Sequence, residues 1–261
     1  MPRYLVIFLG VGLFFSVMHT GCIGGDQKQL DTLSYEMKKL SLSFNQCNPD
    51  SPDCAHISYN YPVFNNQTSA ADSLNAIINL LLGVSGKNTL AKTQETFLSE
   101  YALFVKQNPE NNQVWLSKTN IDVPFQSSSI VCIGVNMYDF TGGAHGLYSQ
   151  IYSCYDRKKN RIITIKDLFT QANYQKLLAV AEKNFRAQKS LNDTADLENA
   201  GFWFKDNTFH LNDNFVITNN GVDWLFNPYE VASYADGMIV ISLDKSELQP
   251  LLNPDFLSIW D

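Results

Sequence analysis

The first candidate for chemistry is His145, in the glycine-rich stretch DFTGGAHGLYSQ at residues 139–150. A carboxylate beside an imidazole can orient the ring as a general base, and Asp139 lies in the same stretch as His145. Gly142 and Gly143 favour a tight turn, because glycine adopts positive φ angles without steric cost. Three interpretations stay open: catalysis or metal binding by His145, contact with a ligand at an exposed tip, and a turn with a purely structural role.

A second candidate is Glu230, in the segment NPYEVASYADG at residues 227–237. Aromatic rings with a carboxylate can stack on a sugar and hydrogen-bond to it, and Tyr229 and Tyr234 flank Glu230. The same tyrosines can instead pack in the core with their hydroxyls reaching solvent. The candidate ligand-binding residues are therefore Gly142, Gly143, His145, Tyr229, Glu230 and Tyr234.

The familiar catalytic motifs are missing from the sequence. It has no serine in a strand-to-helix elbow, no phosphate loop, no dinucleotide glycine fingerprint and no paired-histidine metalloprotease motif. His56 or His210 would have to join His145 to complete a metal site, and histidines are scarce. We expect no catalytic residues, no metal and no cofactor. The rival hypothesis is a cell-wall polymer hydrolase with His145 and Glu230 as acid and base.

The N-terminal residues resemble an export signal. Arg3 precedes an apolar run from Leu5 to Met18, which is too short for a comfortable membrane span and is followed by Gly21 and Cys22. A small residue before a cysteine is typical of a bacterial lipoprotein cleavage site, with Cys22 as the lipidated residue. This predicts a signal peptide at 1–21, a tether at 22–38, and a lipid-anchored protein of the bacterial cell envelope facing the periplasm or exterior; secretion with a different cut and an uncleaved anchor are the alternatives.

The charge balance of the exported chain is acidic. Removing residues 1–21 removes one of the 19 basic residues and leaves 26 acidic ones, for a formal charge of −8. Nucleic acid is therefore not an expected partner, because no basic patch could dominate the surface. A basic protein partner stays possible, as does an acidic surface that serves only solubility.

Four cysteines follow Cys22, an even number for a chain expected in an oxidising compartment. Cys47 and Cys54 bracket the turn-forming segment NPDSPD between two strand-like runs, which favours their pairing. Zinc is a poor alternative, because neither local pair has the two-residue spacing of a zinc knuckle.

The other two cysteines flank the glycine-rich stretch. Cys132 and Cys154 are equidistant from Gly143, so a hairpin that closes there places them opposite each other. The sequence therefore predicts a disulfide and a register in which facing residue numbers sum to about 286, as 132 and 154 do, with Tyr138 opposite Tyr148.

Hydrophobic periodicity predicts an α+β fold with mostly antiparallel sheets and two or three packed helices. The length of 261 residues fits one large domain or two small intertwined ones, and we expect two intertwined subdomains, at 39–125 and 126–261. Helices are expected over 69–83, 89–107 and 171–188, and strands over 114–155, with a break at Pro124. RIITIKDLF is expected as a strand, FVITNNGVDWLF as a hairpin turning at Asn220-Gly221, and GMIVISL as a last strand before a short helix capped by Asp244.

Two segments together resemble a known bacterial module. They are YDFTGGAHGLYSQIYSCYDRKKNRIITIKDLF and GVDWLFNPYEVASYADGMIVISLDKSELQPLL. Similar segments occur in the outer domain of RsiV-type anti-sigma factors, which binds lysozyme, and beside the deacetylase domain of PdaC-type peptidoglycan deacetylases. Upstream, ISYNYPVFNN and ADSLNAIINLLL are similar to the partner domain of this module, so the resemblance covers roughly residues 40–255.

This resemblance implies an envelope-facing recognition module. We expect a lipid-anchored, non-enzymatic protein that recognises a lysozyme-like protein or peptidoglycan, held to the membrane by its lipid anchor. Ser233, Asp236 and Met238 stand where members of the family often have Pro, Ala and Pro. The alternatives are the hydrolase described above and a scaffold lipoprotein without a soluble ligand.

Overall fold

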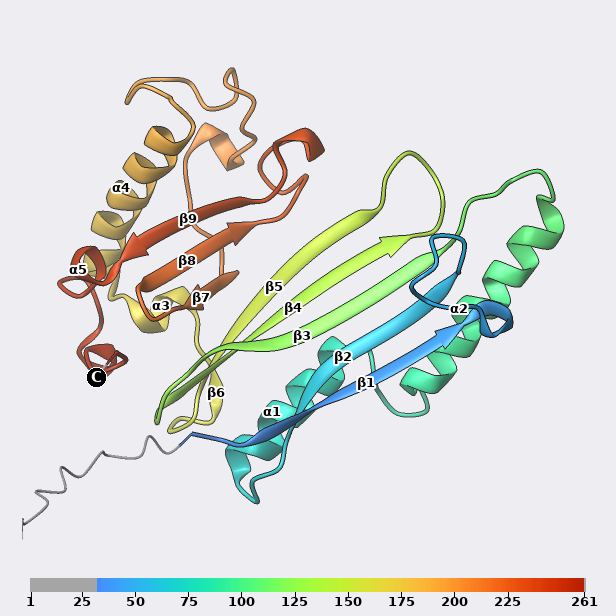
Figure 1. Cartoon of the computed structure of the whole chain (residues 1–261). Coiled ribbons are helices and arrows are strands. Elements are labelled where there is room, and N and C mark those ends of the chain that lie inside the picture. The colour runs from blue at the N-terminus through green and yellow to red at the C-terminus, as the bar shows by residue number, and fades with distance from the viewer. Residues whose placement is uncertain (1–31, 261) are drawn as a thin grey trace, which may run out of the picture. The chain divides into compact units, whose positions relative to one another are not determined.

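Two β-sheets organise the computed structural model, which describes residues 32–260 (Figure 1). The larger sheet has the strand order β1-β2-β3-β4-β5-β6, and the smaller has the order β7-β8-β9. The strands are β1 (Tyr35–Ser43), β2 (His56–Phe64), β3 (Leu116–Gln126), β4 (Ile130–Phe140), β5 (Leu147–Asp156), β6 (Arg161–Ile162), β7 (Phe215–Ile217), β8 (Gly221–Phe226) and β9 (Ile239–Asp244). The predicted α+β class is confirmed.

All neighbouring strands pair antiparallel except β2 and β3, which run parallel. This exception follows from the connection between them, because parallel neighbours need a long crossover. The crossover contains the helices α1 (Ser69–Leu81) and α2 (Leu90–Gln107), which agree with two predicted helices. The side chains of Thr68 and Thr89 cap their first turns, and Gly83, with a φ of 71°, follows the end of α1.

The third long helix, α4 (Gln171–Gln188), packs against β9 of the smaller sheet, as Figure 1 shows. Two short helices have a single turn each: α3 (Ile165–Leu168) precedes α4, and α5 (Lys245–Leu248) follows β9. The 3-10 turns are Phe44–Gln46, Lys205–Asn207, Tyr234–Asp236 and Pro254–Phe256. The predicted capping of α5 by Asp244 is confirmed, because Asp244 and Glu247 form a capping box.

Three local predictions were wrong. RIITIKDLF is a strand only at Arg161–Ile162 and then becomes α3, because Thr164 and Asp167 form a capping box. Pro124 does not end β3 but lies at a bulge, where the pairing with β4 shifts between Asp122 and Phe125. The β7–β8 turn precedes Gly221, which is already in β8; a Cβ there would collide with the carbonyl oxygen of Leu243 on β9.

The expected segment boundaries fall at particular places in this fold. β1 begins at Tyr35, inside the segment expected as a tether at 22–38. The boundary expected between residues 125 and 126 falls inside β3, one residue before its end, and β3 pairs with β4 in the same sheet. The signal peptide expected at 1–21 and the lipidated Cys22 lie outside the described residues.

Two apolar cores lie on opposite faces of the larger sheet, because successive side chains of a strand point to opposite faces. Val131 and Ile133 of β4 belong to the core under α1, whereas Ile130 and Cys132 belong to the core shared with the smaller sheet. That second core covers only one end of its face. Further along β4, Asn136 and Tyr138 are only partly buried.

The outer edge of β5 is closed by asparagine side chains. Asn227 accepts a hydrogen bond from the backbone nitrogen of Gln150 at 2.7 Å and donates one to its carbonyl oxygen at 3.0 Å. Asn214 accepts from the backbone nitrogen of Tyr152 at 2.8 Å and donates to the Gln150 carbonyl at 2.9 Å. These amides replace a missing strand, so they satisfy backbone groups that an open edge would leave unpaired.

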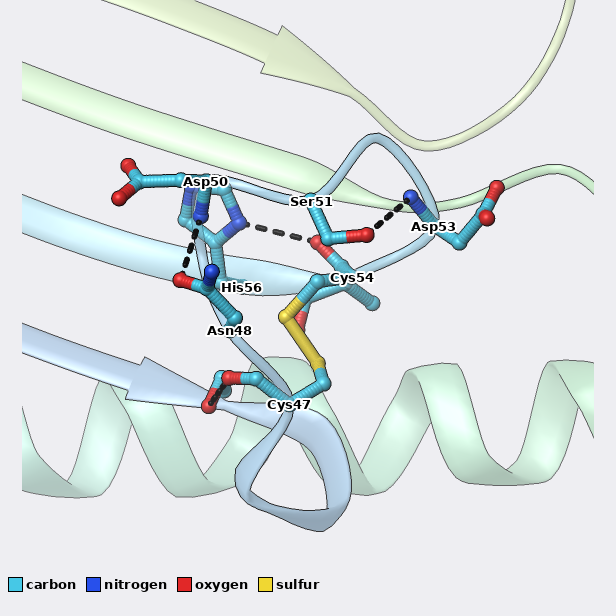
Figure 2. Close-up of a disulfide and its surroundings, with 9 residues drawn as sticks. Cys47, Asn48, Asp50, Ser51, Asp53, Cys54 and His56 are labelled. Atoms are coloured by element: carbon cyan, nitrogen blue, oxygen red, sulfur yellow. Dashed lines mark hydrogen bonds between the residues drawn. A yellow bond between two sulfur atoms is a disulfide. The ribbon is translucent and has the colours of Figure 1, made fainter.

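Two disulfides hold the hairpins. Cys47 and Cys54 close the loop between β1 and β2, and Figure 2 shows the buried His56 beside them, with Nδ1 3.0 Å from the carbonyl oxygen of Cys54. Cys132 and Cys154 are bonded across β4 and β5. Both pairs are the ones that the spacing in the sequence predicts.

Candidate functional site

The glycine-rich stretch is the turn of the β4–β5 hairpin. Cys132 faces Cys154 and Tyr138 faces Tyr148, so the predicted register is confirmed. Gly142 and Gly143 have φ angles of 111° and 101°, which L side chains rarely adopt. Gly142 lies against Gln113, whose Nε2 donates to the Gly143 carbonyl at 3.1 Å. Gly146 has a different role, since a Cβ there would lie 2.5 Å from the ring of Tyr138.

The segment at residues 227–237 forms a second surface loop, and hydrogen bonds to the Glu230 carboxylate stabilise it. One carboxylate oxygen accepts from the backbone nitrogen of Asn227 at 2.8 Å, and the other accepts from the Asn212 amide at 2.7 Å. Tyr229 has a φ of 68° and is 54% exposed. Ser233 and Asp236 form a capping box at the next turn. The Glu230 carboxylate therefore holds the loop, and the loop presents Tyr229 to solvent.

The two loops meet through aromatic rings. His145 stacks on Tyr234 with ring centroids 3.9 Å apart and an interplanar angle of 16°. The Tyr234 hydroxyl donates to the carbonyl oxygen of Gly146 at 2.9 Å, and Tyr229 lies 5.7 Å from Tyr234 between ring centroids. We call His145, Tyr229 and Tyr234 the aromatic patch. It joins residues that lie more than 80 positions apart in the sequence.

His145 is not paired with Asp139, as the interpretation of His145 as a general base would require. Asp139 accepts a hydrogen bond from the Ser117 hydroxyl at 2.6 Å, while His145 Nδ1 lies 3.2 Å from the Gly146 carbonyl oxygen. Both oxygens of Glu230 are engaged within its own loop. Among residues 32–260, no group of three histidine, cysteine or acidic side chains could hold a metal ion. What the patch offers chemically is stacking and hydrogen bonding.

Two titratable groups with shifted pKa values, Asp122 and Tyr152, lie close together on the larger sheet. Asp122 is exposed as a residue, but partial burial of its carboxyl raises its pKa. Burial together with the charge of Asp122 raises the pKa of Tyr152. These side chains come together over Gly134, where a Cβ would lie 2.5 Å from the Asp122 carboxylate and 2.9 Å from the Tyr152 ring. Sequence analysis did not single these residues out. In the sequence, Gly134 is the residue that could have indicated them, because a glycine within a strand often marks a close approach of another group.

Comparison with known proteins divides the chain into two matched regions. Residues 50–148 match the family model described as "Deacetylase PdaC", and residues 166–246 match the one described as "Protein of unknown function (DUF3298)". The peptidoglycan-N-acetylmuramic acid deacetylase PdaC of Bacillus subtilis (strain 168) is 24% identical over 202 residues, which are 76% of this chain. The chain spans only 39% of the length of that relative.

Two solved structures share the fold. A member of the DUF3298 family from Bacteroides fragilis superposes with a TM-score of 0.66 at 17% identity, covering 87% of this chain and 96% of that one. A DUF3298 family protein from Pseudomonas aeruginosa PAO1 gives 0.59 at 19% identity, covering 86% and 96%. Within residues 32–260, no helix is both long enough and apolar enough to span a membrane. Residues 50–148 are thus similar to the PdaC family model and residues 166–246 to the DUF3298 model, while the likeness to RsiV-type anti-sigma factors stays a prediction.

Proposed function

We propose that this protein is a non-enzymatic binding protein of the bacterial cell envelope that recognises peptidoglycan. The observation that carries the proposal is the aromatic patch, in which His145, Tyr229 and Tyr234 come from two loops and lie at the surface. Aromatic rings presented with polar atoms suit sugars, because a ring face stacks on a sugar while nearby polar groups bond its hydroxyls. The candidate contact residues Gly142, Gly143 and Glu230 shape the two loops.

Two further observations support this location and ligand. Two disulfides are typical of proteins in oxidising compartments outside the cytoplasm. The Bacillus subtilis relative is, by its name, an enzyme that acts on peptidoglycan. Attachment through a lipid on Cys22, outside the described residues, would hold the domain at the membrane with its binding loops facing the wall.

The hydrogen bonds that Glu230 makes within its own loop support a binding role over hydrolysis. A hydrolase with His145 and Glu230 as acid and base needs both groups within reach of one substrate atom. Glu230 instead bonds Asn212 and the backbone of Asn227. A hydrolase would therefore have to break the bonds that hold its own loop.

A lysozyme-like protein is the second candidate ligand. The formal charge of −7 over the whole chain, or −8 without residues 1–21, complements a basic protein. Such binding would weaken strongly with added salt, because salt screens exposed charge pairs. Stacking of sugars on aromatic rings has no comparable dependence.

The test is co-sedimentation of the purified protein without residues 1–22 with peptidoglycan sacculi. We expect binding, and a loss of about fivefold in affinity for each of His145→Ala and Tyr229→Ala, since one aromatic contact contributes about 1 kcal/mol. Tyr35→Ala on β1, which removes a 40% exposed tyrosine far along the sheet order from β5, is the matched control and should bind normally. Salt-sensitive binding to lysozyme without binding to sacculi would replace this proposal by the second candidate, and chemical change in the sacculi would contradict a non-enzymatic role.

A further inference from the structure

Four amide side chains form a row across the larger sheet. Asn60 of β2 pairs with Asn120 of β3, Asn120 pairs with Asn136 of β4, and Asn136 pairs with Gln150 of β5. Directly paired residues point to the same face of a sheet. We call Asn60, Asn120, Asn136 and Gln150 the amide row. Its hydrogen bonds include one of 2.5 Å from Asn60 Nδ2 to Asn120 Oδ1.

Tyrosines border this row on both sides. Tyr148, paired with Tyr138, donates to Asn136 Oδ1 at 3.2 Å. On the other side, Gln150 Nε2 donates to the Tyr152 hydroxyl at 2.6 Å. Tyr152 there shares the space over Gly134 with the Asp122 carboxylate. The face thus combines amides, phenol rings and one carboxylate.

This part of the face is open to solvent. The helices α1 and α2 lie on the opposite face, where they contact β1 and β2 (Figure 1). Val131, Ile133 and Val135 of β4, which alternate with the row, belong to the core on that opposite face. Asn120 is exposed with its neighbours Lys118 and Asp122, and Asn136, Tyr138 and Tyr148 are half-buried. A ligand can therefore reach Asn120 and the half-buried side chains beside it without any rearrangement of the fold, whereas the side-chain oxygen of Asn60 is buried.

Stability alone does not account for asparagine at these positions. Asparagine is depleted in strands, where β-branched and aromatic residues pack better on the pleated surface. Yet asparagines occupy directly paired positions on three neighbouring strands, β2, β3 and β4. Places where a sequence breaks a local preference are expected to be functional or strained sites, and here the break recurs on three strands at one place.

We infer that this face binds a chain of N-acetylated sugars laid across the strands, an inference that rests on the proposed function and names its principal contact surface. Amide groups both donate and accept hydrogen bonds, so they complement the hydroxyl and acetamido groups of such sugars. Neighbouring strands lie about 4.8 Å apart, which is close to the length of one sugar ring, so successive sugars meet successive strands. Exposed Lys39, paired with Asn60, and exposed Lys118 outnumber the one carboxylate on this face, Asp122. The two lysines therefore disfavour the cationic, deacetylated form of the chain.

The end of the row at β5 leads to the aromatic patch. Gln150 is bonded through its backbone to Asn227, and Tyr229 follows Asn227 by two residues. A sugar chain that continues past Gln150 therefore approaches the loop that presents Tyr229. A protein partner suits this face less well, because the centre of a protein interface is usually rich in apolar side chains, and the amide row has none.

The test measures binding of a soluble probe, the β-1,4-linked hexamer of N-acetylglucosamine, by titration calorimetry. We expect the wild type to bind it and the Asn120→Ala/Asn136→Ala double variant to bind about tenfold more weakly, because each replacement removes contacts with the sugar. Tyr148→Phe removes only a hydroxyl and serves as the variant least able to disturb folding. The matched control is Asn112→Ala, an exposed asparagine in the loop after α2, which should bind as the wild type does.

The outcomes separate this inference from the proposed function. No binding of the hexamer, equal binding of the fully deacetylated hexamer, or normal binding by the double variant would each overturn the sugar-binding face. If the double variant loses affinity for lysozyme instead, the face binds protein and the inference is equally overturned. Sacculus binding that depends on His145 and Tyr229 but not on the amide row would leave the proposed function standing without this face.

Discussion

Replacing Asn227 with alanine should destabilise the fold, because the Asn227 amide substitutes for a strand at the edge of β5. The amide bonds both the nitrogen and the carbonyl oxygen of Gln150, at 2.7 and 3.0 Å. Alanine removes both bonds and supplies nothing in their place. The carbonyl keeps one donor, Asn214 at 2.9 Å, whereas the nitrogen is left without a protein partner.

The magnitude follows from the group left unpaired. An unsatisfied buried donor costs about 1–3 kcal/mol, and a net hydrogen bond contributes about 1 kcal/mol. Gln150 is half-buried, so water can reach part of this edge and the lower half of the range applies. We therefore expect a loss of about 2 kcal/mol in the free energy of unfolding, which corresponds to a fall of about 4–8 °C in Tm for a domain of this size.

The assay is urea unfolding at neutral pH, with Asn112→Ala as the matched control for loss of an exposed amide. Asn214→Ala should cost a similar amount, and the double variant should deviate from additivity, because both side chains bond the same Gln150 carbonyl. A change below about 0.5 kcal/mol in Asn227→Ala would show that water replaces the amide and would refute the account of the edge.

Two other perturbations test the hairpin and the turn after it. Replacing both Cys132 and Cys154 by alanine opens a loop of 22 residues, so the free energy of unfolding should fall by about 3 kcal/mol; a loss under 1 kcal/mol in urea unfolding contradicts this. The hydrogen bond from Arg161 holds the pKa of the Asp167 carboxyl well below its usual range. A depressed pKa adds stability above the unfolded value of about 4 and loses it as the pH falls. Between about pH 4 and pH 2 the wild type should therefore lose more stability than Asp167→Asn, and equal losses would rule this pair out as the cause.

The elements that the sequence predicts well are those set by nearby residues. Gly143 lies midway between Cys132 and Cys154, and this symmetry was enough to predict the register of the whole β4–β5 hairpin. The helices α1 and α2 follow from the spacing of their apolar residues and from the threonines before them. Each of these signals acts within a few turns or across one hairpin.

The elements that the sequence missed depend on contacts between distant residues or on a competing local signal. Nothing near β2 indicates that it runs parallel to β3, because that choice is made by the packing of the crossover helices. RIITIKDLF alternates like a strand, but Thr164 and Asp167 satisfy the first backbone groups of a helix, and that cap decides the structure. The capping pair was present in the sequence and could have been recognised.

The sequence names the residues of the candidate site, which stay a prediction, but it does not show which partners their side chains have. His145 and Tyr234 were both named, yet their stacking depends on a contact between segments 89 positions apart, which no local pattern shows. The sequence suggests Glu230 as an acid, a base or a sugar contact. In the structure, hydrogen bonds from Asn212 and Asn227 engage its carboxylate, which stabilises the loop. Residue type suggests what a side chain can do, and only its partners determine what it does.

The two matched regions form one unit for a structural reason. The PdaC-like region ends at residue 148, at the start of β5, and the DUF3298-like region begins at 166, after that strand. Strand β5 lies almost wholly between the two matched regions, and without the second region it would expose its outer edge. An open edge invites pairing with other chains. Asn214 and Asn227, both in the second region, close that edge and fix the backbone of Gln150. The side chain of Gln150 is the last member of the amide row, so the second region positions the end of a surface built almost wholly by the first.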